Sequence, residues 1–555
     1  MSVKHKLAGA LQQAIVSARG EGLLAVDSLP EIVIERPQNP KHGDYATSIP
    51  LKLARSETGA SNPLEIAERI VRFIPSLPEV GRVVAVPPGF INFELSPEWL
   101  CKQVQVVLDS GLSFGDIDIG GGKSVQIEFV SVNPTGPLHV GHGRGAVLGS
   151  TLANVLGAAG YRVQREYYIN DAGSQLDAFS RSLYARYRQC FGEEAEVPAD
   201  GYLGNYMVDL AEEIAREEGR RFLDMPVEVA AKELGEIGVR KILETIRRDL
   251  ALLGVEFDIW FSERSLYDGG QYGKVMELLK EGGYVVDKEN AIWFTSSALG
   301  DDKDNVLVRS DSSPTYFASD IAYHFNKFVE RNFDMVVDIW GADHQGHVPR
   351  MIAAMNALGI PPERLKIIIC QLVTLRRGKE IVRVSKRSGD IITLREVIDE
   401  VGTDACRFFF LSRSADAQMD FDLELAKKQS ADNPVYYVQY AHARICSILR
   451  LAQDRGIDYS PGEVYLLTSE PEQALIKQMI LLPEMIELIA STLEPHHLSY
   501  FAQDLATVFH TFYKQCRVVS KNREQTLARL KLVKATQIVL AKTLGLMGVG
   551  APERM

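Results

Sequence analysis

Long apolar runs, paired cysteines and an excess of positive charge are all missing from this sequence of 555 residues. It has no run of about 18 or more apolar residues, so it predicts no helix that crosses a membrane. The six cysteines are scattered without a C-x-x-C pair, which argues against a disulfide framework and against a zinc ribbon. The net charge of −12 excludes a general basic coat, so any contact with nucleic acid has to be local.

What the sequence does contain is typical of a large globular protein. Hydrophobic residues make up 46% and charged residues 24%, and the length suffices for about three or four domains. The first twenty residues contain no acid, as in transit peptides, but Leu7, Leu11, Ile15 and Ala18 have the spacing of an amphipathic helix. We therefore expect this segment to lead into the first domain and the chain to be cytoplasmic.

Residues 1–120 predict a small α+β domain that ends at a flexible joint, the triple glycine at 120–122. After the first helix, the pattern predicts a strand at 31–35, a helix near 63–73 and paired strands around 83–86 and 90–95.

Strands and helices alternate from residue 125 onward, which predicts a Rossmann-like, doubly wound parallel sheet in residues 121–395. We expect a helical, acidic insertion at about 185–310 to split this domain, because residues 193–236 carry 13 acidic and 4 basic residues and look solvated. The alternation resumes with a strand at 334–340. Such sheets bind their ligands at the carboxyl ends of the strands.

Beyond residue 395 the apolar periodicity is helical throughout. Residues 396–432 predict a connecting segment, and residues 433–555 predict an all-α bundle. Within the bundle, residues 517–537 carry six basic residues against one acid, Glu524. Such a stripe is either a solvated helix face or a local contact for a polyanion. The six are Arg517, Lys521, Arg523, Arg529, Lys531 and Lys534.

The segment at residues 125–159 carries the clearest chemistry. A β-branched strand runs through a Pro/Gly turn into a helix, and His139, Gly141 and His142 stand at the junction. The N-terminus of a helix offers backbone N–H groups and the positive end of its dipole, which favour phosphate. Two imidazoles three residues apart share one face, and Gly141 lets a flat ring approach the backbone. This arrangement predicts a nucleotide triphosphate site.

Three competing interpretations of this region are weaker. Zinc would need Cys or Glu ligands at suitable spacing, and the sequence offers none nearby. Two unrelated surface histidines would not explain the strand–turn–helix context. Gly122-Lys123-Ser124 imitates the end of a P-loop, but Ile117 occupies the place of its first glycine and the segment precedes the strand.

Four regions, in the same order along nearly the whole chain, resemble the arginyl-tRNA synthetase family of class I aminoacyl-tRNA synthetases. HVGH at 139–142 resembles the first class signature, and Val384-Ser385-Lys386-Arg387-Ser388 resembles the second, a mobile lysine loop. PKHGDYATSIP and PPGFINFEL resemble the N-terminal domain of the arginine enzyme, and NPVYYVQYAHARI with the final APERM resembles its anticodon-binding domain. One position departs: the second signature usually opens with lysine, and this chain has Arg383, whose guanidinium is less compact.

The resemblance implies a ligase that activates L-arginine with ATP to arginyl-adenylate and transfers it to the 3′ end of tRNA(Arg), releasing AMP and pyrophosphate. It implies Mg²⁺ bound with the ATP, no zinc, and an activation step that requires bound tRNA. The partners are then tRNA(Arg), L-arginine and ATP, and the enzyme is a cytoplasmic monomer without membrane contact. Residues 1–120 would bind tRNA, 396–432 would contact its stem, and 433–555 would bind the anticodon.

The resemblance also implies roles for single residues. Catalysis around the phosphates is assigned to His139, His142 and Lys386. ATP binding is assigned to His139, Gly141, His142, Gly341, Asp343, His344, Ser385 and Lys386. The arginine substrate is surrounded by Glu128, Asn133, Tyr316, Asp320 and Gln345. Contacts to tRNA are assigned to Phe90, Asn92, Tyr436, Tyr440 and Met555, although core packing is an alternative role for Phe90 and helix packing for the tyrosines.

Charge supports the arginine site independently of the resemblance. A guanidinium group favours carboxylates in a planar, bidentate arrangement. Tyr316 and Asp320 are four residues apart and share a helix face, and Glu128 stands in an apolar strand where a buried charge needs a ligand or another reason. Asn170, Asp171 and Gly173 either line the same site or form a tight turn.

Two alternatives stay open: a class I synthetase of another amino-acid specificity, and a catalytically silent tRNA-binding paralogue. A cysteine enzyme would need zinc-binding cysteines, and a silent paralogue would be expected to lose His139, His142 or Lys386, which are all present. An editing role for the insertion is not expected, because substrates without a guanidinium group leave buried carboxylates unpaired and are rejected at binding.

Overall fold

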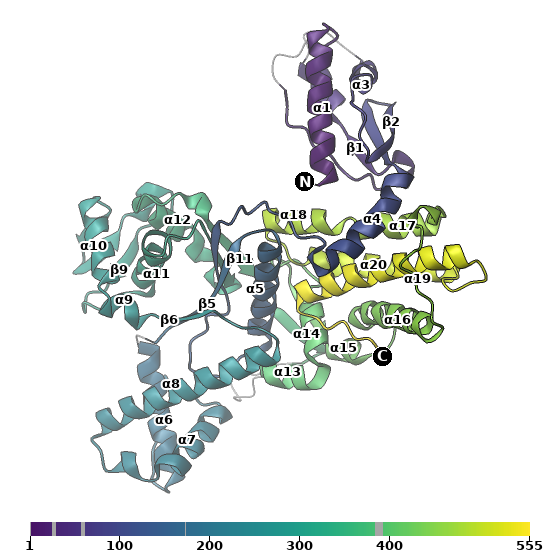
Figure 1. Cartoon of the computed structure of the whole chain (residues 1–555). Helices are drawn as coiled ribbons and strands as arrows, with labels where there is room; N and C mark the ends of the chain where they lie inside the picture. The colour runs from purple at the N-terminus through teal and green to yellow at the C-terminus, as the bar shows by residue number, and fades with distance from the viewer. Residues whose placement is uncertain (1, 25–28, 57–61, 172–173, 383–391) are drawn as a thin grey trace.

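The computed structural model describes residues 2–24, 29–56, 62–171, 174–382 and 392–555. Figure 1 shows a small N-terminal domain that projects from the rest of the chain, a central sheet flanked by helices, and a helical bundle that holds the C-terminus. Helices α6 (Ser174–Cys190) and α8 (Val227–Leu252) extend on the side away from the N-terminal domain (Figure 1).

The N-terminal domain packs three helices against an antiparallel sheet of order β1-β3-β2. Leu7, Leu11 and Ile15 are buried, which confirms the amphipathic first helix. The strand predicted at 31–35 is wrong: Glu35 makes a single bridge to Ala46, because the strand that it borders is only three residues long. The elements are α1 (Val3–Gly20), β1 (Tyr45–Thr47), α2 (Ile49–Ser56), α3 (Pro63–Val71), β2 (Val80–Val86) and β3 (Phe90–Leu95).

Five parallel strands form the central sheet in the order β11-β10-β4-β5-β6. The chain leaves the middle strand, β4, toward one edge through β5 and β6, and then fills the other side with β10 and β11. This is the order of a doubly wound sheet, as predicted, and it places the topological switch point between β4 and β10. The strands are β4 (Ser124–Glu128), β5 (Arg162–Ile169), β6 (Ile259–Ser262), β10 (Met335–Gly341) and β11 (Leu365–Cys370).

Helix α5 (Val140–Ala158) follows β4 and is embedded in the protein along most of its length. Its residues are apolar or small on nearly every side, which is typical of a buried helix. At Gly149 a Cβ atom would lie 2.3 Å from the ring of Phe129, so only glycine permits this close approach of helix to sheet. The N-terminus of α5, which carries the histidine pair, is therefore held on a rigid element.

The insertion is less uniformly helical than predicted. Helices α6, α7 (Asn205–Glu218) and α8 account for it up to Leu252, but β6 then returns to the central sheet. A small antiparallel sheet of order β7-β8-β9 follows, and its strands of four residues are too short for a clear alternating pattern in the sequence. These strands are β7 (Val285–Lys288), β8 (Ala291–Phe294) and β9 (Asn305–Val308).

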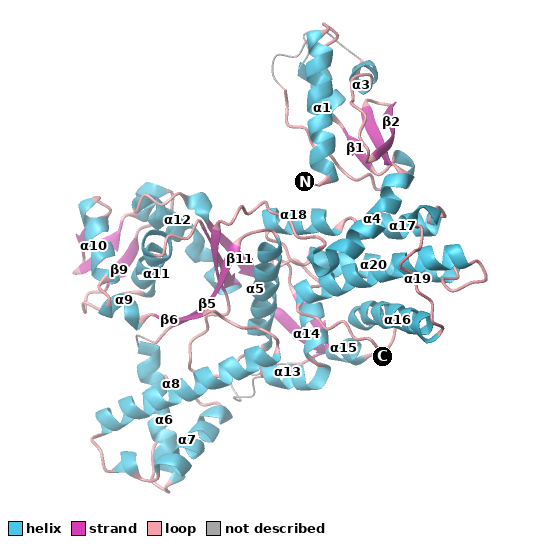
Figure 2. Ribbon diagram, in the orientation of Figure 1, coloured by secondary structure: helices cyan, strands magenta, loops and turns pink. Residues whose placement is uncertain are grey.

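The C-terminal region is the all-α bundle that the sequence predicts, and it is drawn in Figure 2 as helices joined by loops. Helix α4 (Pro97–Ser110), from the first 120 residues, packs against two of the bundle helices, α17 and α20. The main helices are α16 (Pro434–Asp454), α17 (Glu470–Met479), α18 (Leu482–Thr492), α19 (His497–Gln515) and α20 (Arg523–Met547).

The basic stripe of the bundle is not one continuous exposed face. Arg529 donates a hydrogen bond of 2.7 Å to Glu472, which is almost fully buried, and Lys531 donates to Gln105 of α4 at 3.1 Å. Part of the stripe therefore holds helices together, and its charge is compensated inside the protein.

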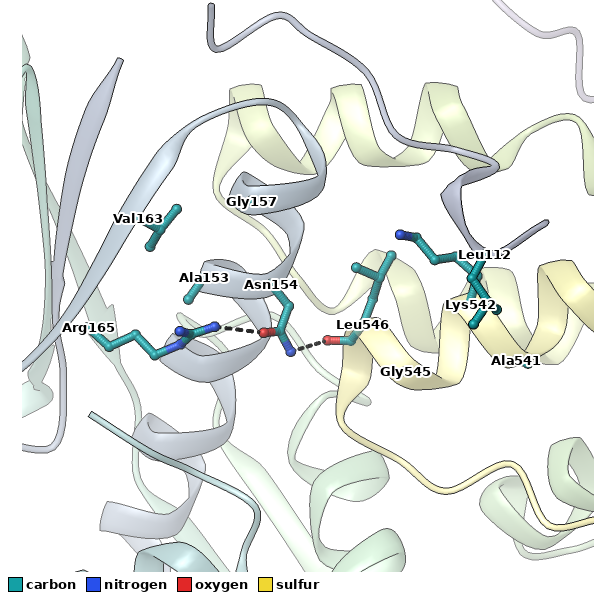
Figure 3. A pocket seen from close by; sticks show the side chains of 10 residues that line it. All are labelled: Leu112, Ala153, Asn154, Gly157, Val163, Arg165, Ala541, Lys542, Gly545 and Leu546. Atoms are coloured by element: carbon teal, nitrogen blue, oxygen red, sulfur yellow. Dashed lines mark hydrogen bonds between the residues drawn. The ribbon is translucent and has the colours of Figure 1, made fainter. Parts of the chain in front are cut away.

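A cavity of about 560 Å³ marks the junction between α5 and α20 (Figure 3). Arg165 donates to Asn154 at 3.0 Å, and the Asn154 amide donates to the carbonyl of Leu546 at 3.0 Å, so hydrogen bonds cross from the sheet to the bundle (Figure 3). On the bundle side Lys542 pairs with Asp116 at 2.6 Å. The residues that line this cavity are distinct from those predicted for the nucleotide and amino-acid site.

All six cysteines are free thiols, and five of them are buried. In the part of the chain that the structure describes, no helix is both long enough and apolar enough to cross a membrane.

Candidate active site

The connection from β4 to α5 adopts a strained conformation just before the histidine motif. Val130 and Ser131 have φ angles of +70° and +40°, which are unfavourable for side chains and especially for a β-branched one. Ser131 Oγ accepts the backbone N–H of Tyr168 at 3.1 Å, and the Tyr167 hydroxyl donates to the carbonyl of Val132 at 2.9 Å. The neighbouring strand β5 thus holds the loop in place.

His139 and His142 together form a capping box at the N-terminus of α5. His139 is the N-cap residue, and its Nδ1 accepts the N–H of Gly141 at 3.1 Å, while Nδ1 of His142 accepts the N–H of His139 at 3.2 Å. The two rings are stacked with their centroids 3.5 Å apart, which confirms that they share one face. A Cβ at Gly141 would lie 3.0 Å from the His139 ring, so the glycine leaves room for it.

These hydrogen bonds also determine where the histidine protons are. Because each Nδ1 accepts a backbone N–H, a neutral ring carries its proton on Nε2. Burial, together with the neighbouring His139, lowers the pKa of His142 to about 3, so this ring is neutral at physiological pH. Two Nε2–H donors therefore accompany the backbone N–H groups of the first helical turn, a combination suited to an anion.

Asp320 lies on α11 (Tyr316–Phe325), one helical turn after Tyr316. Burial raises the pKa of Asp320 to about 6; His324 lowers it and Glu128 raises it further. A carboxyl group with a raised pKa in a pocket gains most from a cationic ligand, since the cation stabilises its ionised form.

Glu263 is a second acid, close enough to Asp320 to be affected by its charge, and the sequence pattern did not predict it. It follows β6 directly, is 3% exposed, and has its pKa raised to about 7 mainly by burial, with Asp320 and Asp171 adding to the rise and Ser319 opposing it. The pKa of the Tyr316 hydroxyl is raised by burial and by Glu263. The sequence signal for Glu263, one acid directly after a four-residue strand, is weak.

Glu128 belongs to a row of three buried acids. In the sheet it pairs in register with Asp338 of β10 on one side and with Glu166 of β5 on the other, so all three side chains leave the same face. The Nζ atom of Lys327 lies 2.6 Å from Glu128 Oε2 and 2.9 Å from Asp338 Oδ1, and Arg331 makes a bidentate pair with Glu166. From the sequence we expected a ligand to explain the buried charge of Glu128. The structure shows that this charge also has a partner within the protein, Lys327.

The loop after β10 carries several residues predicted to bind ATP or arginine. A Cβ at Gly341 would lie 2.5 Å from an Asp343 carboxylate oxygen, but that side chain is exposed and can move aside, so the contact does not require glycine there. His344 lies 3.5 Å from Asp343 and close enough to Asp320 to lower its pKa. The loop forms η6 (Ala342–His347), in which Asp343, His344 and Gln345 are exposed.

The contacts of Asp171 favour the tight turn over a place in the pocket. Its two carboxylate oxygens accept the Arg264 backbone N–H at 3.0 Å and the Ser262 hydroxyl at 2.5 Å. Asn133, in the loop before α5, donates to Gln175 at 2.5 Å. Asn170 precedes Asp171 in the same connection.

The second class signature lies outside the described residues, which exclude 383–391. The predictions for Arg383, Ser385, Lys386 and Arg387 fall there, and Gly173 falls in the excluded pair 172–173.

The residues predicted to contact tRNA lie on two domains. Phe90 and Asn92 are on β3, the middle strand of the N-terminal sheet, where Phe90 is half-buried and Asn92 is 8% exposed. Tyr436 and Tyr440 are on α16 with nearly parallel rings, 7° apart, and centroids at 6.2 Å.

The C-terminal tail lies against the same helix. His442 binds the carbonyl of Pro552 at 2.9 Å, and Arg450 donates to the carbonyl of Glu553 at 3.2 Å. Met555 is exposed at the end of this tail.

Besides its solvated surface, the insertion contacts the loop that precedes the histidine pair. Tyr206 of α7 donates its hydroxyl to the carbonyl of Thr135 at 2.8 Å, and its ring lies against Gly136. The insertion therefore supports the loop that leads into the histidine pair.

Three family models match consecutive parts of this chain. The model described as arginyl tRNA synthetase N terminal domain matches residues 1–95. The model for tRNA synthetases class I (R), catalytic domain, matches residues 103–441, and the DALR anticodon binding domain matches residues 438–555. The catalytic model alone spans more than half of the chain.

Curated relatives match over the full length. An arginine–tRNA ligase from Dehalococcoides mccartyi is 59% identical over 555 residues, covering 100% of this chain and 99% of the relative. One from Moorella thermoacetica is 48% identical over 556 residues with the same coverage.

Solved structures show the same architecture. The putative arginyl tRNA synthetase from Campylobacter jejuni is 34% identical with a TM-score of 0.76, covering 83% of this chain and 100% of its own. The arginyl-tRNA synthetase from Thermus thermophilus, at 22% identity, shares the fold with a TM-score of 0.78 over 100% of both chains.

Proposed function

This chain belongs to the arginyl-tRNA synthetase family of class I aminoacyl-tRNA synthetases, and on that premise we propose how its own residues act. It activates L-arginine with ATP and transfers the arginyl group to tRNA. The roles of single residues, the identity of the tRNA as tRNA(Arg), the monomeric state and the cytoplasmic location are the proposed part.

One arrangement supports the proposed site most strongly. The stacked His139 and His142 begin α5 at the switch point of the sheet, and the half-buried Asp320 and the buried Glu263 are acids whose pKa values burial raises. Donors for an anion together with acids that favour a cation are what the activation of arginine by ATP requires.

In the first step the arginine carboxylate attacks the α-phosphate of ATP, the bond to the β-phosphate breaks, and pyrophosphate leaves with its electron pair. His139 and His142 donate Nε2–H to the phosphates and stabilise the charge that builds up there. Lys386 is proposed to neutralise the outer phosphates, with Ser385 and Gly141 contributing contacts. The step needs alignment and charge stabilisation, and no covalent enzyme intermediate.

The acid pocket recognises the substrate side chain in this proposal. Asp320 pairs with the guanidinium group, Glu263 adds a second negative charge, and Tyr316 lines the pocket. Glu128 and Asn133 bind the backbone end of the amino acid. The exposed loop with Gly341, Asp343, His344 and Gln345 is proposed to contact the ribose of ATP and the amino acid.

In the second step a ribose hydroxyl of the terminal tRNA adenosine attacks the carbonyl of the adenylate, and AMP leaves. Within the described ranges no group of three or more His, Cys, Asp or Glu side chains is arranged to hold a metal ion. Mg²⁺ bound with ATP would be held mainly by phosphate oxygens and water, as is usual for this ion, and would neutralise phosphate charge. Tyr436, Tyr440 and Met555 are proposed to contact the anticodon, and Phe90 and Asn92 another part of the tRNA.

Pyrophosphate exchange with each amino acid, with and without total tRNA, tests this proposal. We expect signal with arginine alone and little of it when tRNA is omitted. A His142→Asn variant controls for contaminating synthetase. Equal exchange with another amino acid would contradict the arginine specificity, and tRNA binding without any exchange would favour a silent paralogue.

A further inference from the structure

We propose that Lys327, which the mechanism above does not use, is a positioning residue for the amino-acid substrate. Its ammonium group bridges Glu128 and Asp338 and keeps Glu128 ionised and in place for the α-ammonium group of the substrate. This inference deepens the proposed function and rests on it.

The central sheet brings two carboxylates close together. Glu128 and Asp338 are register partners on adjacent parallel strands and are 8% and 0% exposed. Adjacent strands are about 4.8 Å apart, so two ionised acids at this position repel each other unless a cation lies between them. Lys327 is fully buried, touches both acids at 2.6 and 2.9 Å, and lies 4.1 Å from the centroid of the Tyr323 ring.

The backbone explains how a lysine comes to point inward here. Lys327 lies in a π-helical turn, η5 (Asn326–Glu330), that continues α11 directly. The wider turn changes the direction in which the side chains point, and single π turns are frequent at functional sites. Since α11 carries Tyr316 and Asp320, the contacts of Lys327 also hold the helix that forms the substrate pocket.

Two cations face the row of acids. Lys327 bridges Glu128 and Asp338, and Arg331 pairs with Glu166. His324 also contacts the row, with one ring nitrogen 2.7 Å from the Asp320 carbonyl and the other 2.7 Å from an Asp338 carboxylate oxygen. Lys327 is the cation that contacts Glu128, so loss of the lysine charge removes the positive charge paired with this acid.

The pKa directions agree with this role. The pKa of the Glu128 carboxyl is raised overall, mainly by burial, and Lys327 is the strongest of the influences that limit this rise. Burial likewise opposes ionisation of Asp338, but Lys327 and His324 bring its pKa down to about 2. The titratable groups near Glu128 are Asp338 on β10, Glu166 and Tyr168 on β5, Asp320, Tyr323 and His324 on α11, and Lys327 on η5.

The test removes the bridging charge without leaving a charge imbalance. In the double variant Lys327→Met with Asp338→Asn, one charge of each sign is lost, and Glu128 keeps no direct cationic partner. We expect the arginine KM to rise at least about tenfold at pH 7.5 while the ATP KM stays within about twofold. We also expect the acid limb of kcat/KM for arginine to move up by about one pH unit, because the pKa of Glu128 rises.

The chain offers a matched control on the next strand. Arg331→Met with Glu166→Gln removes the same kind of buried pair from the same row, farther along the element. It should lower Tm comparably but leave the arginine KM within about threefold of wild type. The single Asp338→Asn variant, which keeps the Lys327–Glu128 pair, should behave in the same way.

The inference would be overturned if the arginine and ATP KM values of the Lys327→Met, Asp338→Asn variant rose in parallel. It would also be overturned if the acid limb of kcat/KM for arginine did not move in this variant. If that variant does not fold, Lys327→Arg decides: it keeps a cation in the row and should leave the acid limb at its wild-type pH, and an upward shift would contradict the proposal. Wild-type exchange with arginine is measured in the same assay. Absence of exchange by the wild type would count against the proposed function itself. Normal exchange by the wild type, together with variants whose arginine and ATP KM values change in parallel, would contradict only the role of Lys327.

Discussion

Nδ1 of His142 accepts the backbone N–H of His139 across a stack of two imidazole rings whose centroids are 3.5 Å apart. Nδ1 of His139 is occupied in the same way by the N–H of Gly141. One pair of side chains thus caps α5 through Nδ1 and, in the proposed mechanism, donates to phosphate through Nε2. Because capping and the proposed phosphate contacts involve different atoms of the same rings, substitutions can separate the two roles.

His139→Asn should retain the cap and lose the phosphate donor. Asparagine is a good N-cap residue, so the free energy of unfolding should stay within about 0.5 kcal/mol of wild type. Arginine-dependent pyrophosphate exchange should fall about 10²- to 10³-fold. His139→Ala should lose the same activity and also about 1 kcal/mol of stability. Urea unfolding and exchange kinetics measure the two effects, and a fully active His139→Asn enzyme would refute the phosphate role.

Asp320→Asn should weaken arginine binding selectively. Loss of a charge-assisted, bidentate contact to guanidinium costs about 2–4 kcal/mol, which corresponds to an arginine KM increase on the order of 10²-fold. The ATP KM should change by less than about threefold, since the nucleotide makes no use of this carboxylate. Asp268→Asn, at an exposed acid on α9 (Arg264–Asp268), is the control. Equal changes in both KM values would count against the guanidinium contact.

Arginine binding should weaken as the pH falls below about 7. The pKa of Asp320 is raised to about 6 and that of Glu263 to about 7, so both acids lose their charge as the pH falls through these values. The arginine KM should therefore rise toward pH 5.5 while the ATP KM does not follow. In Glu263→Gln the rise should begin at lower pH; an unchanged profile would exclude Glu263 from the pocket.

The same two groups make the effect of arginine on stability depend on pH. Their pKa values in the folded state lie above the unfolded ones, so they favour folding at low pH and lose this contribution as the pH rises through about 6 to 7. Bound arginine stabilises the ionised forms and reverses the loss. The increase in Tm caused by arginine should be larger at pH 8 than at pH 5.5, and a larger increase at pH 5.5 would contradict this linkage.

Arg407 should be important for stability without taking part in chemistry. On α14 (Thr403–Phe410) it is fully buried and donates to the carbonyls of Met547 at 2.7 Å and Leu253 at 2.9 Å, and to Ser150 Oγ at 2.9 Å. Burial lowers its pKa to about 10, which leaves it charged. Arg407→Met leaves these acceptors without their donor and should reduce the free energy of unfolding by about 3 kcal/mol.

Gly548 provides a second test of the same contact. Its φ is +66°, and a Cβ there would lie 2.5 Å from the Arg407 guanidinium, so Gly548→Ala should also destabilise the protein. Arg413→Met, at an exposed arginine, should change stability by less than about 0.5 kcal/mol. Denaturant unfolding measures all three, and a stable Arg407→Met variant would contradict the assignment.

Tyr440→Ala should weaken tRNA binding if its ring stacks on a base. Such stacking contributes about 1–3 kcal/mol, so the tRNA KM should rise roughly tenfold while the arginine KM measured at saturating tRNA stays unchanged. Tyr440→Phe keeps the ring and loses only the hydrogen bond from Arg444, so it should bind tRNA almost as wild type does. Similar losses in the two variants would point to the hydroxyl instead.

Local patterns predicted the elements whose residues are close together in the chain. The spacing of Leu7, Leu11 and Ile15 is enough to indicate a helix face, and the strand–turn–helix pattern is enough to place His139 at a helix start, because both depend on near neighbours. Short elements with few residues, such as β6 to β9, carry too little periodicity, and the predicted insertion was accordingly too helical.

Contacts between distant segments account for what the sequence did not reveal. Lys327 lies 199 residues from Glu128 in the chain, and their pairing depends on the register of β4 against β10 and on a π turn that no local pattern announces. Glu263 gives no signal by itself, since its raised pKa depends on burial beside Asp320.

The amino-acid sequence alone determined the doubly wound sheet, the α-helical end of the chain and the histidine pair at a helix start, because periodicity and turn residues act over a few positions. Only the tertiary structure decided which acids share a pocket and which cations balance them. Those choices depend on burial and strand register, and both arise only when distant segments pack together.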